Sequence, residues 1–132
     1  MNDSISIGEL ARRTGVSVHT LRYYEKAGLM IPVPRDRLGC RAYTSDHTRW
    51  VSFLLRLREG GMGIAQLRRY AELTRSNTDP DGAQRTALLS AHRDQLRERV
   101  RRLTQHLEVL DRKIAAGCRV DDPSPGEGST GA

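Results

Sequence analysis

The stretch of sequence that decides the fold is SVHTLRYYEKAGL, which runs from Ser17 to Leu29. It follows a shorter helix-like stretch, Ile7 to Thr14, across a turn at Gly15 and Val16. Two short helices joined by a turn that contains glycine are typical of a helix-turn-helix. The later stretch combines an apolar side with a basic and aromatic side. A helix that packs on a core and reads the major groove of DNA needs that combination.

The ends of both short helices carry local signals. Ser6 and Glu9 form the S-x-x-E pattern of a capping box, and Gly15 suits the left-handed end of the first helix. Ser17 is a natural N-cap for the second helix, and Gly28 is a natural stop. We therefore expect the second helix to lie between these two residues.

The segment from residue 30 to residue 43 differs from its neighbours. Pro32 and Pro34 exclude a helix, and Leu38 with Gly39 offers a turn. Three arginines lie in this short segment: Arg35, Arg37 and Arg41. We expect a small β-hairpin wing here, and the alternative is an irregular loop with solvated arginines.

Two further stretches, which begin near Thr44 and Ile64, place apolar residues at helical spacing. We interpret these residues as core and not as a cofactor site. They are Trp50, Val51, Leu54 and Leu57 in the first stretch, and Ile64, Leu67, Tyr70 and Ala71 in the second. These helices complete the expected DNA-binding domain over residues 4–75, which a linker at 76–82 follows.

A long helix is expected over residues 83–116. Apolar residues recur along it with a heptad repeat: Leu89, Leu96, Val100, Leu103, Leu107, Leu110 and Ile114. A narrow apolar seam on a charged helix requires a partner, and a second copy of the chain is the simplest one. The alternative is a helix that folds back on its own N-terminal domain. The residue pattern alone mildly favours a parallel pair. The tail, residues 117–132, is rich in Gly, Pro, Ser and Asp and is expected to be disordered.

Composition limits the class of protein. The chain has 132 residues and a formal net charge of +6, which fits one domain with an appendage. Arginine dominates the basic residues, which suits phosphate and guanine recognition but also follows from high-GC codon usage. The N-terminus lacks the pattern of a signal peptide, and no apolar run approaches the roughly 20 residues that span a bilayer. We expect a cytoplasmic protein without membrane association.

The whole motif set resembles the MerR family of bacterial transcription regulators. The matching residues run, in order, through Ile5-x-Ile-Gly-Glu-Leu-Ala, Thr14-Gly-Val-Ser, Thr20-Leu-Arg-Tyr-Tyr-Glu-x-x-Gly-Leu29, Pro32, Arg35, Gly39-x-Arg-x-Tyr43, Leu57-Arg-x-x-Gly61-Met62 and Ile64. The resemblance covers residues 5 to about 75. It implies a winged helix-turn-helix and a homodimer joined by an antiparallel coiled coil. It also implies a two-fold operator in an over-long promoter spacer, whose distortion affects RNA polymerase.

The resemblance assigns DNA-contacting roles to particular residues. Arg22 and Tyr23 are expected on the groove-facing side of the second helix, with Val18 and His19 in its first turn. His19 is the candidate for operator discrimination, and the alternative is a solvent-exposed side chain next to a phosphate. Ser17 and Thr20 are expected either to contact phosphate or only to cap the helix. In the wing, Arg35, Arg41 and Tyr43 are expected to grip the DNA backbone, which gives salt dependence without reading sequence.

No effector or cofactor is identified by these residues. Cys118 lies where metal-sensing relatives carry a cysteine, but residues 119–132 contain neither Cys nor His, so we expect no metal site unless it is shared across the dimer. Two cysteines are too few for an iron–sulfur cluster. The chain also resembles the small aldehyde- and thiol-responsive regulators, although Arg56 stands where some of those carry a reactive cysteine. Cys40, beside Arg41, and Cys118 are therefore candidates for redox or electrophile sensing.

Other classes of protein remain as alternatives. One is an architectural or recombination-accessory DNA-binding protein with the same head, and another is a coiled-coil adaptor. Enzyme activity is not expected. The glycines at 60–63 lack the following Lys-Ser/Thr of a phosphate loop, and the chain has no H-E-x-x-H or G-x-S-x-G motif.

Overall fold

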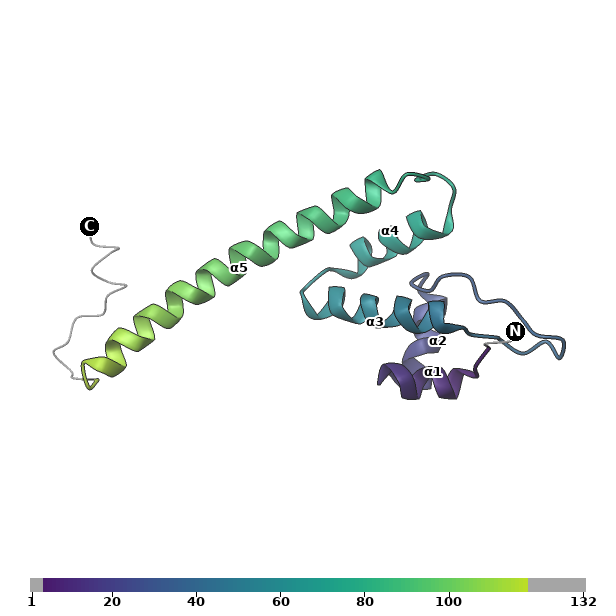
Figure 1. Ribbon diagram of the computed structural model, residues 1–132, viewed down its shortest axis with the longest axis horizontal. Helices are drawn as coiled ribbons and strands as arrows, with labels where there is room; N and C mark the ends of the chain where they lie inside the picture. The colour runs from purple at the N-terminus through teal and green to yellow at the C-terminus, as the bar shows by residue number, and fades with distance from the viewer. Residues whose placement is uncertain (1–3, 119–132) are drawn as a thin grey trace. The chain divides into compact units, whose positions relative to one another are not determined.

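The computed structural model describes residues 4–118 and contains five helices in that range (Figure 1). They are α1 (Ile7–Thr14), α2 (Val18–Lys26), α3 (Ser45–Glu59), α4 (Ile64–Arg75) and α5 (Ala83–Ala115). The chain divides into two compact units, the first ending at Ser90 and the second beginning at Ala91. We call residues 4–90 the head and residues 91–118 the distal segment. The prediction of a disordered tail lies, from residue 119 onward, outside the described residues.

The mainly helical class is confirmed, and local rules explain where α1 and α2 begin. The Ser6 Oγ accepts a hydrogen bond from the Glu9 backbone N–H at 3.1 Å, and Gly15 ends α1 with φ 73°. Ser17 caps α2 in the same way. Only the serine half of the expected capping box forms, because the Glu9 carboxylate pairs instead with Arg12 and Arg13.

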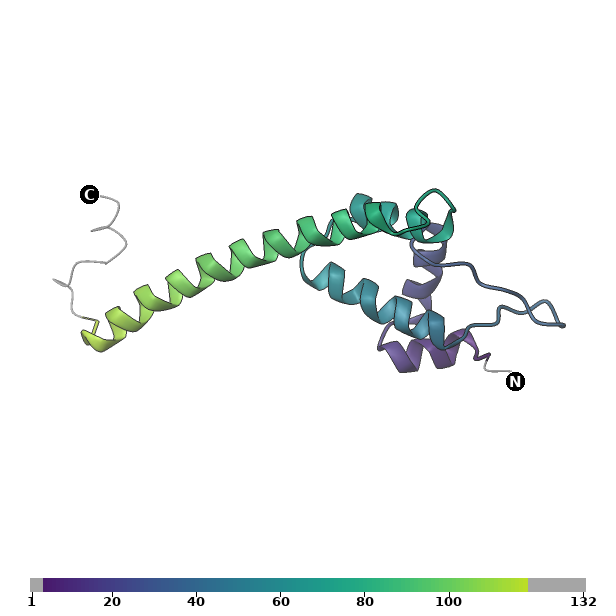
Figure 2. The ribbon, with the colours of Figure 1, turned by 45° about the horizontal axis from the view of Figure 1, so that its top comes forward.

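The core of the head lies between α1, α2, α3 and α4. Helix α1 packs on α2 and α3, and α3 packs on α4, an arrangement visible in Figure 2. Almost fully buried side chains fill the space between them: Leu10, Leu21, Tyr24, Leu29, Tyr43, Val51, Leu54 and Leu67. Leu89, in the first turns of α5, packs against the same cluster. Val51, Leu54 and Leu67 are positions that the helical spacing predicts to be core, whereas Ile64, which the same spacing also predicts to be core, is 43% exposed.

His47 completes the start of α3. Its Nδ1 accepts a hydrogen bond from the Thr44 N–H at 3.0 Å, and its Nε2 lies 2.7 Å from the Pro32 carbonyl oxygen. One neutral tautomer satisfies both contacts, with Nδ1 as acceptor and Nε2–H as donor. The buried ring of His47 therefore ties the segment after α2 to the beginning of α3.

The segment between α2 and α3 lacks the regular strands of the expected hairpin. Among residues 4–118 only two isolated antiparallel bridges occur, one between Ile5 and Tyr43 and one between Arg35 and Arg41. The Asp36 N–H donates to the Cys40 carbonyl at 2.8 Å, so the chain does reverse direction here. Prolines at 32 and 34 have no N–H to donate, and this shortens any strand ladder. We call residues 34–42 the wing loop.

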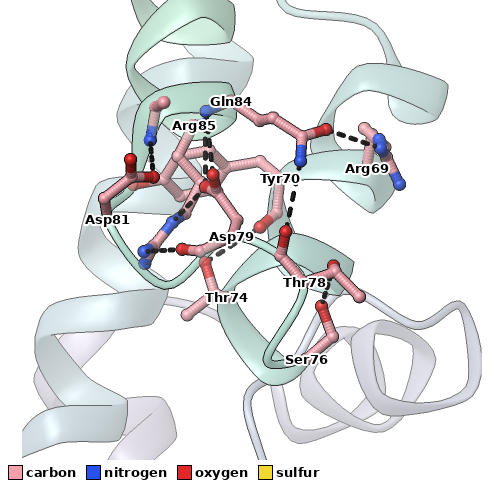
Figure 3. Close-up of polar contacts among 10 residues, drawn as sticks. Arg69, Tyr70, Thr74, Ser76, Thr78, Asp79, Asp81, Gln84 and Arg85 are labelled. Atoms are coloured by element: carbon pink, nitrogen blue, oxygen red, sulfur yellow. Dashed lines mark hydrogen bonds and ion pairs between the residues drawn. The ribbon is translucent and has the colours of Figure 1, made fainter.

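The connection between α4 and α5 is organised by a buried carboxylate (Figure 3). Asp79 Oδ1 accepts from the Gln84 N–H at 2.9 Å, and Oδ2 accepts from the Arg85 N–H at 3.1 Å and from Arg85 Nε at 3.0 Å. Helix α5 begins at Ala83, four residues after Asp79. The Asp79 carboxylate accepts from first-turn N–H groups of this helix, which otherwise lack partners.

The pKa of Asp79 reflects these contacts. Burial raises the pKa, but the N–H groups of Gln84 and Arg85 and the Arg85 guanidinium outweigh burial and hold the pKa below its usual value.

Within residues 4–118, no helix combines the length and the apolar character that a bilayer crossing requires.

Replacing Asp79 by Asn is expected to lower the midpoint of urea unfolding. The amide keeps the shape of the carboxylate but loses its charge and directs an NH₂ group at the donors around it. The matched control is Asp81→Asn, because the Asp81 side chain is exposed and accepts one N–H, from Ala83 at 3.1 Å. Asp79→Asn should be clearly the less stable variant at neutral pH.

The pH dependence of the same variant gives a second check. A carboxylate whose folded pKa is depressed stabilises the fold above its unfolded pKa, about 3.9 for Asp. That contribution is lost as the pH falls through the lower folded value. The stability difference between wild type and Asp79→Asn should therefore persist from neutral pH down to about pH 4 and shrink below it. A difference that stays constant at lower pH would contradict the assigned role.

Candidate nucleic-acid interface

Helix α2 separates its two sides cleanly. Leu21 and Tyr24 are buried in the core, whereas His19, Arg22 and Tyr23 are exposed. Residues spaced by three and four positions share one face of a helix. His19 therefore lies on the same exposed face as Arg22 and Tyr23, as expected from the sequence.

Arg22 is available for an outside ligand. Within the described residues it makes no hydrogen bond or ion pair with another protein group. Tyr23 is 49% exposed, and its ring lies at a tilt against that of Tyr24, with the ring centroids 6.1 Å apart. A guanidinium with unused donors beside an exposed phenol provides groups that can reach base edges or phosphates.

The hydroxyls at the start of α2 are engaged in capping. Ser17 Oγ accepts from the Thr20 N–H at 3.0 Å and donates to Thr20 Oγ1 at 2.9 Å. The capping interpretation of these two residues is therefore satisfied within the protein. Val18 is half-buried in the first turn, beside exposed His19. Contacts of Ser17, Val18, His19 and Thr20 with DNA remain predictions.

The tip of the wing loop is held in one conformation by local hydrogen bonds. Asp36 Oδ1 accepts the N–H groups of Leu38 and Cys40, both at 2.9 Å. Arg35 Nη1 donates to the Gly39 carbonyl at 2.7 Å, and Gly39 has φ 79°, a value that favours glycine. Arg35 and Arg41, both exposed, face each other across this turn as the two partners of one antiparallel bridge.

Tyr43 requires a correction. Its side chain is fully buried, and its hydroxyl donates to Glu25 Oε1 at 2.5 Å. The ring also meets that of His47 edge to face, with centroids 5.5 Å apart. A phenol in this position cannot grip the DNA backbone, so the expectation for Tyr43 is wrong. Tyrosine follows the wing segment because it closes the core at that end of the loop.

Glu25 is the residue that sequence reasoning missed. It accepts the hydrogen bond of Tyr43 and also pairs with Arg41, whose Nη2 lies 3.0 Å from Glu25 Oε2. Glu25 is therefore the carboxylate that joins α2 to both the wing loop and its exit. Its place directly after the two tyrosines of the central motif is a signal, but nothing in the sequence indicates its partners 16 and 18 residues later.

The electrostatics of this junction follow from the burial of Tyr43. Burial raises the pKa of Tyr43 above its usual value, and the hydrogen bond to the Glu25 carboxylate and its charge raise it further. Arg41 and Arg22 act in the opposite direction. The geometric link between α2 and the wing loop is the ion pair of Glu25 with Arg41.

The two cysteines, Cys40 and Cys118, are exposed and form no disulfide. Cys40 lies in the wing loop, and Cys118 follows α5 with φ 58°. Among residues 4–118 no three His, Cys, Asp or Glu side chains gather as metal ligands would. A redox or electrophile-sensing role for either thiol remains a prediction.

The distal segment carries the exposed apolar stripe of α5. Its side chains are between 46% and 68% exposed, and they are Val100, Leu103, Leu107, Leu110 and Ile114. Leu96 is half-buried. Leu89 differs from the others because it belongs to the head and contacts the head's core. The stripe from Val100 onward is the surface that the predicted coiled coil would cover.

Two family models match the chain. One, described as MerR HTH family regulatory protein, matches residues 5–74, and the other, described as MerR, DNA binding, matches residues 48–113. The HTH-type transcriptional regulator YyaN of Bacillus subtilis, itself uncharacterized, is 34% identical over 112 residues. The match covers 82% of this chain and 76% of YyaN.

Solved structures agree with these matches. A crystal structure from Listeria monocytogenes, assigned to the MerR family, has a TM-score of 0.75 and 34% identity, over 84% of this chain and 83% of that one. HiNmlR, described as a MerR family regulator lacking the sensor domain and bound to promoter DNA, has a TM-score of 0.72 and 30% identity. That match covers 85% of this chain and 88% of HiNmlR.

Replacing Tyr43 by Phe is expected to lower the free energy of unfolding by about 1–3 kcal/mol, because the largely buried carboxylate of Glu25, 15% exposed, loses a hydrogen-bond donor. Tyr23→Phe is the matched control, since its exposed hydroxyl should contribute within about 0.5 kcal/mol. Urea unfolding at pH 7 measures both variants.

Alkaline pH tests the same contact. A tyrosine whose folded pKa is raised stabilises the fold fully below its unfolded pKa, about 10, and loses that contribution as the pH rises toward the folded value. The advantage of wild type over Tyr43→Phe should therefore be full at pH 7–9 and decline above about pH 10. An advantage that grows with rising pH would contradict the Tyr43–Glu25 hydrogen bond.

Proposed function

We propose that this chain, which belongs to the MerR family of helix-turn-helix transcriptional regulators, binds a two-fold promoter operator as a homodimer and distorts the DNA between the half-sites. The DNA-binding domain and the regulatory class follow from the family. The placement of DNA on this chain is supported above all by one observation. Glu25 of α2 pairs with Arg41 of the wing loop, so the helix with the reading groups and the loop with the backbone-binding groups are joined through one carboxylate.

In this proposal α2 enters the major groove. Arg22 has unused donors in a planar fork, which suit guanine O6 and N7. His19 and Val18, in the first turn, reach neighbouring base edges and discriminate between operators, and Tyr23 adds a contact from the same face. Ser17 and Thr20 lie at the amino end of α2, where a helix favours phosphate.

The wing loop would bind the backbone outside the groove. Arg41 remains 42% exposed while it pairs with Glu25, and Arg35 is exposed beside it. These arginines add affinity and salt dependence but no sequence information. Tyr43, buried at the end of the wing segment, stabilises the loop through its hydrogen bond to Glu25 and makes no contact with DNA.

The homodimer rests on the apolar stripe of the distal segment. Leucine, valine and isoleucine side chains at heptad spacing and about half exposed are unfavourable in water unless a second helix covers them. A second copy supplies the same stripe, and the family resemblance indicates an antiparallel pair. Two heads on one coiled coil match a two-fold operator, and RNA polymerase at that promoter, in the cytoplasm, would respond to the distorted spacer.

Selection from a pool of random DNA duplexes tests the proposal. The full-length chain should enrich an inverted repeat whose two halves keep one spacing. Enrichment of a single unrepeated site, or of no sequence at all, would overturn the homodimeric operator and favour the architectural alternative.

Replacing Arg22 by Ala is expected to weaken binding to the selected operator by about 1–3 kcal/mol, while binding to an unrelated duplex changes far less. Arg37→Ala, which removes an exposed wing arginine, is the matched control and should weaken binding to both duplexes by a similar small factor. Gel-shift titrations measure the affinities of wild type and of both variants for the two duplexes. If Arg22→Ala leaves the operator affinity unchanged, then Arg22 does not read the groove.

Replacing Leu107 by Glu should convert the dimer into a monomer at micromolar concentration, because the carboxylate would be buried against an apolar partner helix. Gln105→Glu adds the same charge to the same turn away from the stripe and should stay dimeric. Sedimentation velocity distinguishes the two results. A wild-type chain that is itself monomeric, or a Leu107→Glu variant that remains dimeric, would refute dimerisation through the apolar stripe of the distal segment.

A further inference from the structure

The segment that follows α2 has an unusual set of hydrogen bonds. Four consecutive carbonyl groups, those of residues 27–30, each accept from a side chain of α3 or α4. Arg68 Nε donates to the Ala27 oxygen at 2.8 Å, and Trp50 Nε1 donates to the Leu29 oxygen at 2.8 Å. Arg75 Nη1 donates to the oxygens of Gly28 at 2.9 Å and Met30 at 3.1 Å.

From these contacts we propose that Trp50, Arg68 and Arg75 are positioning residues that orient α2 for specific DNA binding. We call the three side chains the carbonyl clamp. The proposal rests on the proposed function of α2 and goes beyond it. It gives two exposed arginines, Arg68 and Arg75, the role of orienting a helix and not the role of binding DNA phosphate.

The physical argument starts from the end of a short helix. The last carbonyls of α2 accept from backbone N–H groups, as the Tyr23 oxygen does from Ala27 and the Tyr24 oxygen from Leu29, both at 2.8 Å. The oxygens of residues 27–30 come directly after the helix and need partners from elsewhere, which the clamp supplies. Arg68 and Arg75 also bring two positive charges to the carboxyl end of α2, where the helix dipole favours them. Gly28 has φ 77°, a value that favours glycine, and a Cβ there would meet Arg68 Cγ at 3.7 Å, an ordinary van der Waals distance.

The clamp also provides a connection that the packing of the helices does not. Helix α4 packs on α3, and α2 packs on α1, but no comparable packing joins α2 directly to α4. Trp50 of α3 stacks on Tyr70 of α4, with ring centroids 5.7 Å apart and an interplanar angle of 11°. The α3 donor is therefore packed against the helix that carries both arginines, and the three donors reach the carboxyl end of α2 from two helices that pack on one another.

A positioning arginine and a phosphate-binding arginine differ in a measurable way. An arginine that binds phosphate contributes about one unit to the slope of log affinity against log salt, and its loss weakens all duplexes alike. An arginine that orients α2 leaves that slope unchanged, but its loss lowers the preference for the operator over unrelated DNA.

The experiment uses the full-length chain with the selected operator and an unrelated duplex of equal length, titrated at several salt concentrations. Arg75→Gln and Arg68→Gln should each reduce the operator preference about tenfold at unchanged salt slope. Arg101→Gln, at an outward position of α5, is the control for loss of one charge. Arg75→Lys should recover part of the preference, because an ammonium group can still donate to one of the carbonyls.

Trp50→Phe gives an independent arm if an arginine variant does not fold. It removes one N–H donor without changing charge, so a reduced operator preference at the wild-type salt slope supports the clamp. Loss of affinity that is equal on both duplexes, with a slope smaller by about one unit, would show that the arginine binds phosphate and would overturn the proposal. An unchanged preference for the operator in Arg68→Gln, Arg75→Gln and Trp50→Phe would also overturn the proposal. A wild-type chain that prefers no sequence would instead refute the proposed function.

Discussion

A helix of nine residues is too short to hold its own conformation in water, and α2 is such a helix. The DNA contacts proposed for α2 therefore depend on the interactions by which the rest of the head fixes this helix in place. Leu21 and Tyr24 anchor its apolar side in the core. Its last turn is bound on the wing side through Glu25 and at its exit through the carbonyl groups of residues 27–30. The exposed side, with Arg22, is left without such ties.

These ties divide the arginines into groups that composition does not distinguish. Several pair with a carboxylate one turn away, as Arg101 does with Glu98, and such exposed pairs contribute little stability. Others donate to backbone oxygens and shape the head, as Arg68 and Arg75 do in the segment after α2. Arg22 makes neither kind of contact in the described part of the chain. Basic charge alone therefore indicates a nucleic-acid partner, but only the contacts indicate which arginines are available to it.

Much of the fold could be predicted from the sequence because its signals are local. Ser17 caps a helix that begins at the next residue, Gly15 ends one, and the spacing of Leu54 and Leu57 indicates a buried face. The rest depends on partners distant in the chain. Tyr43 looks like a wing residue until its partner Glu25, 18 positions earlier, is known. The carbonyl contacts of Arg75 span 45 and 47 positions. No pattern of spacing indicates such pairs. The expected wing forms only isolated bridges in the described segment, where the prolines at 32 and 34 have no N–H to donate.

The most direct test of the central claim is protection of guanine N7 from dimethyl sulfate on the selected operator. N7 of guanine lies in the major groove, whereas N3 of adenine, which the reagent also methylates, lies in the minor groove. If α2 reads the major groove from each half of a homodimer, saturating protein should protect two clusters of guanines related by the two-fold axis of the site. Unprotected guanine N7 in both half-sites, with protection confined to adenine N3, would contradict the placement of α2.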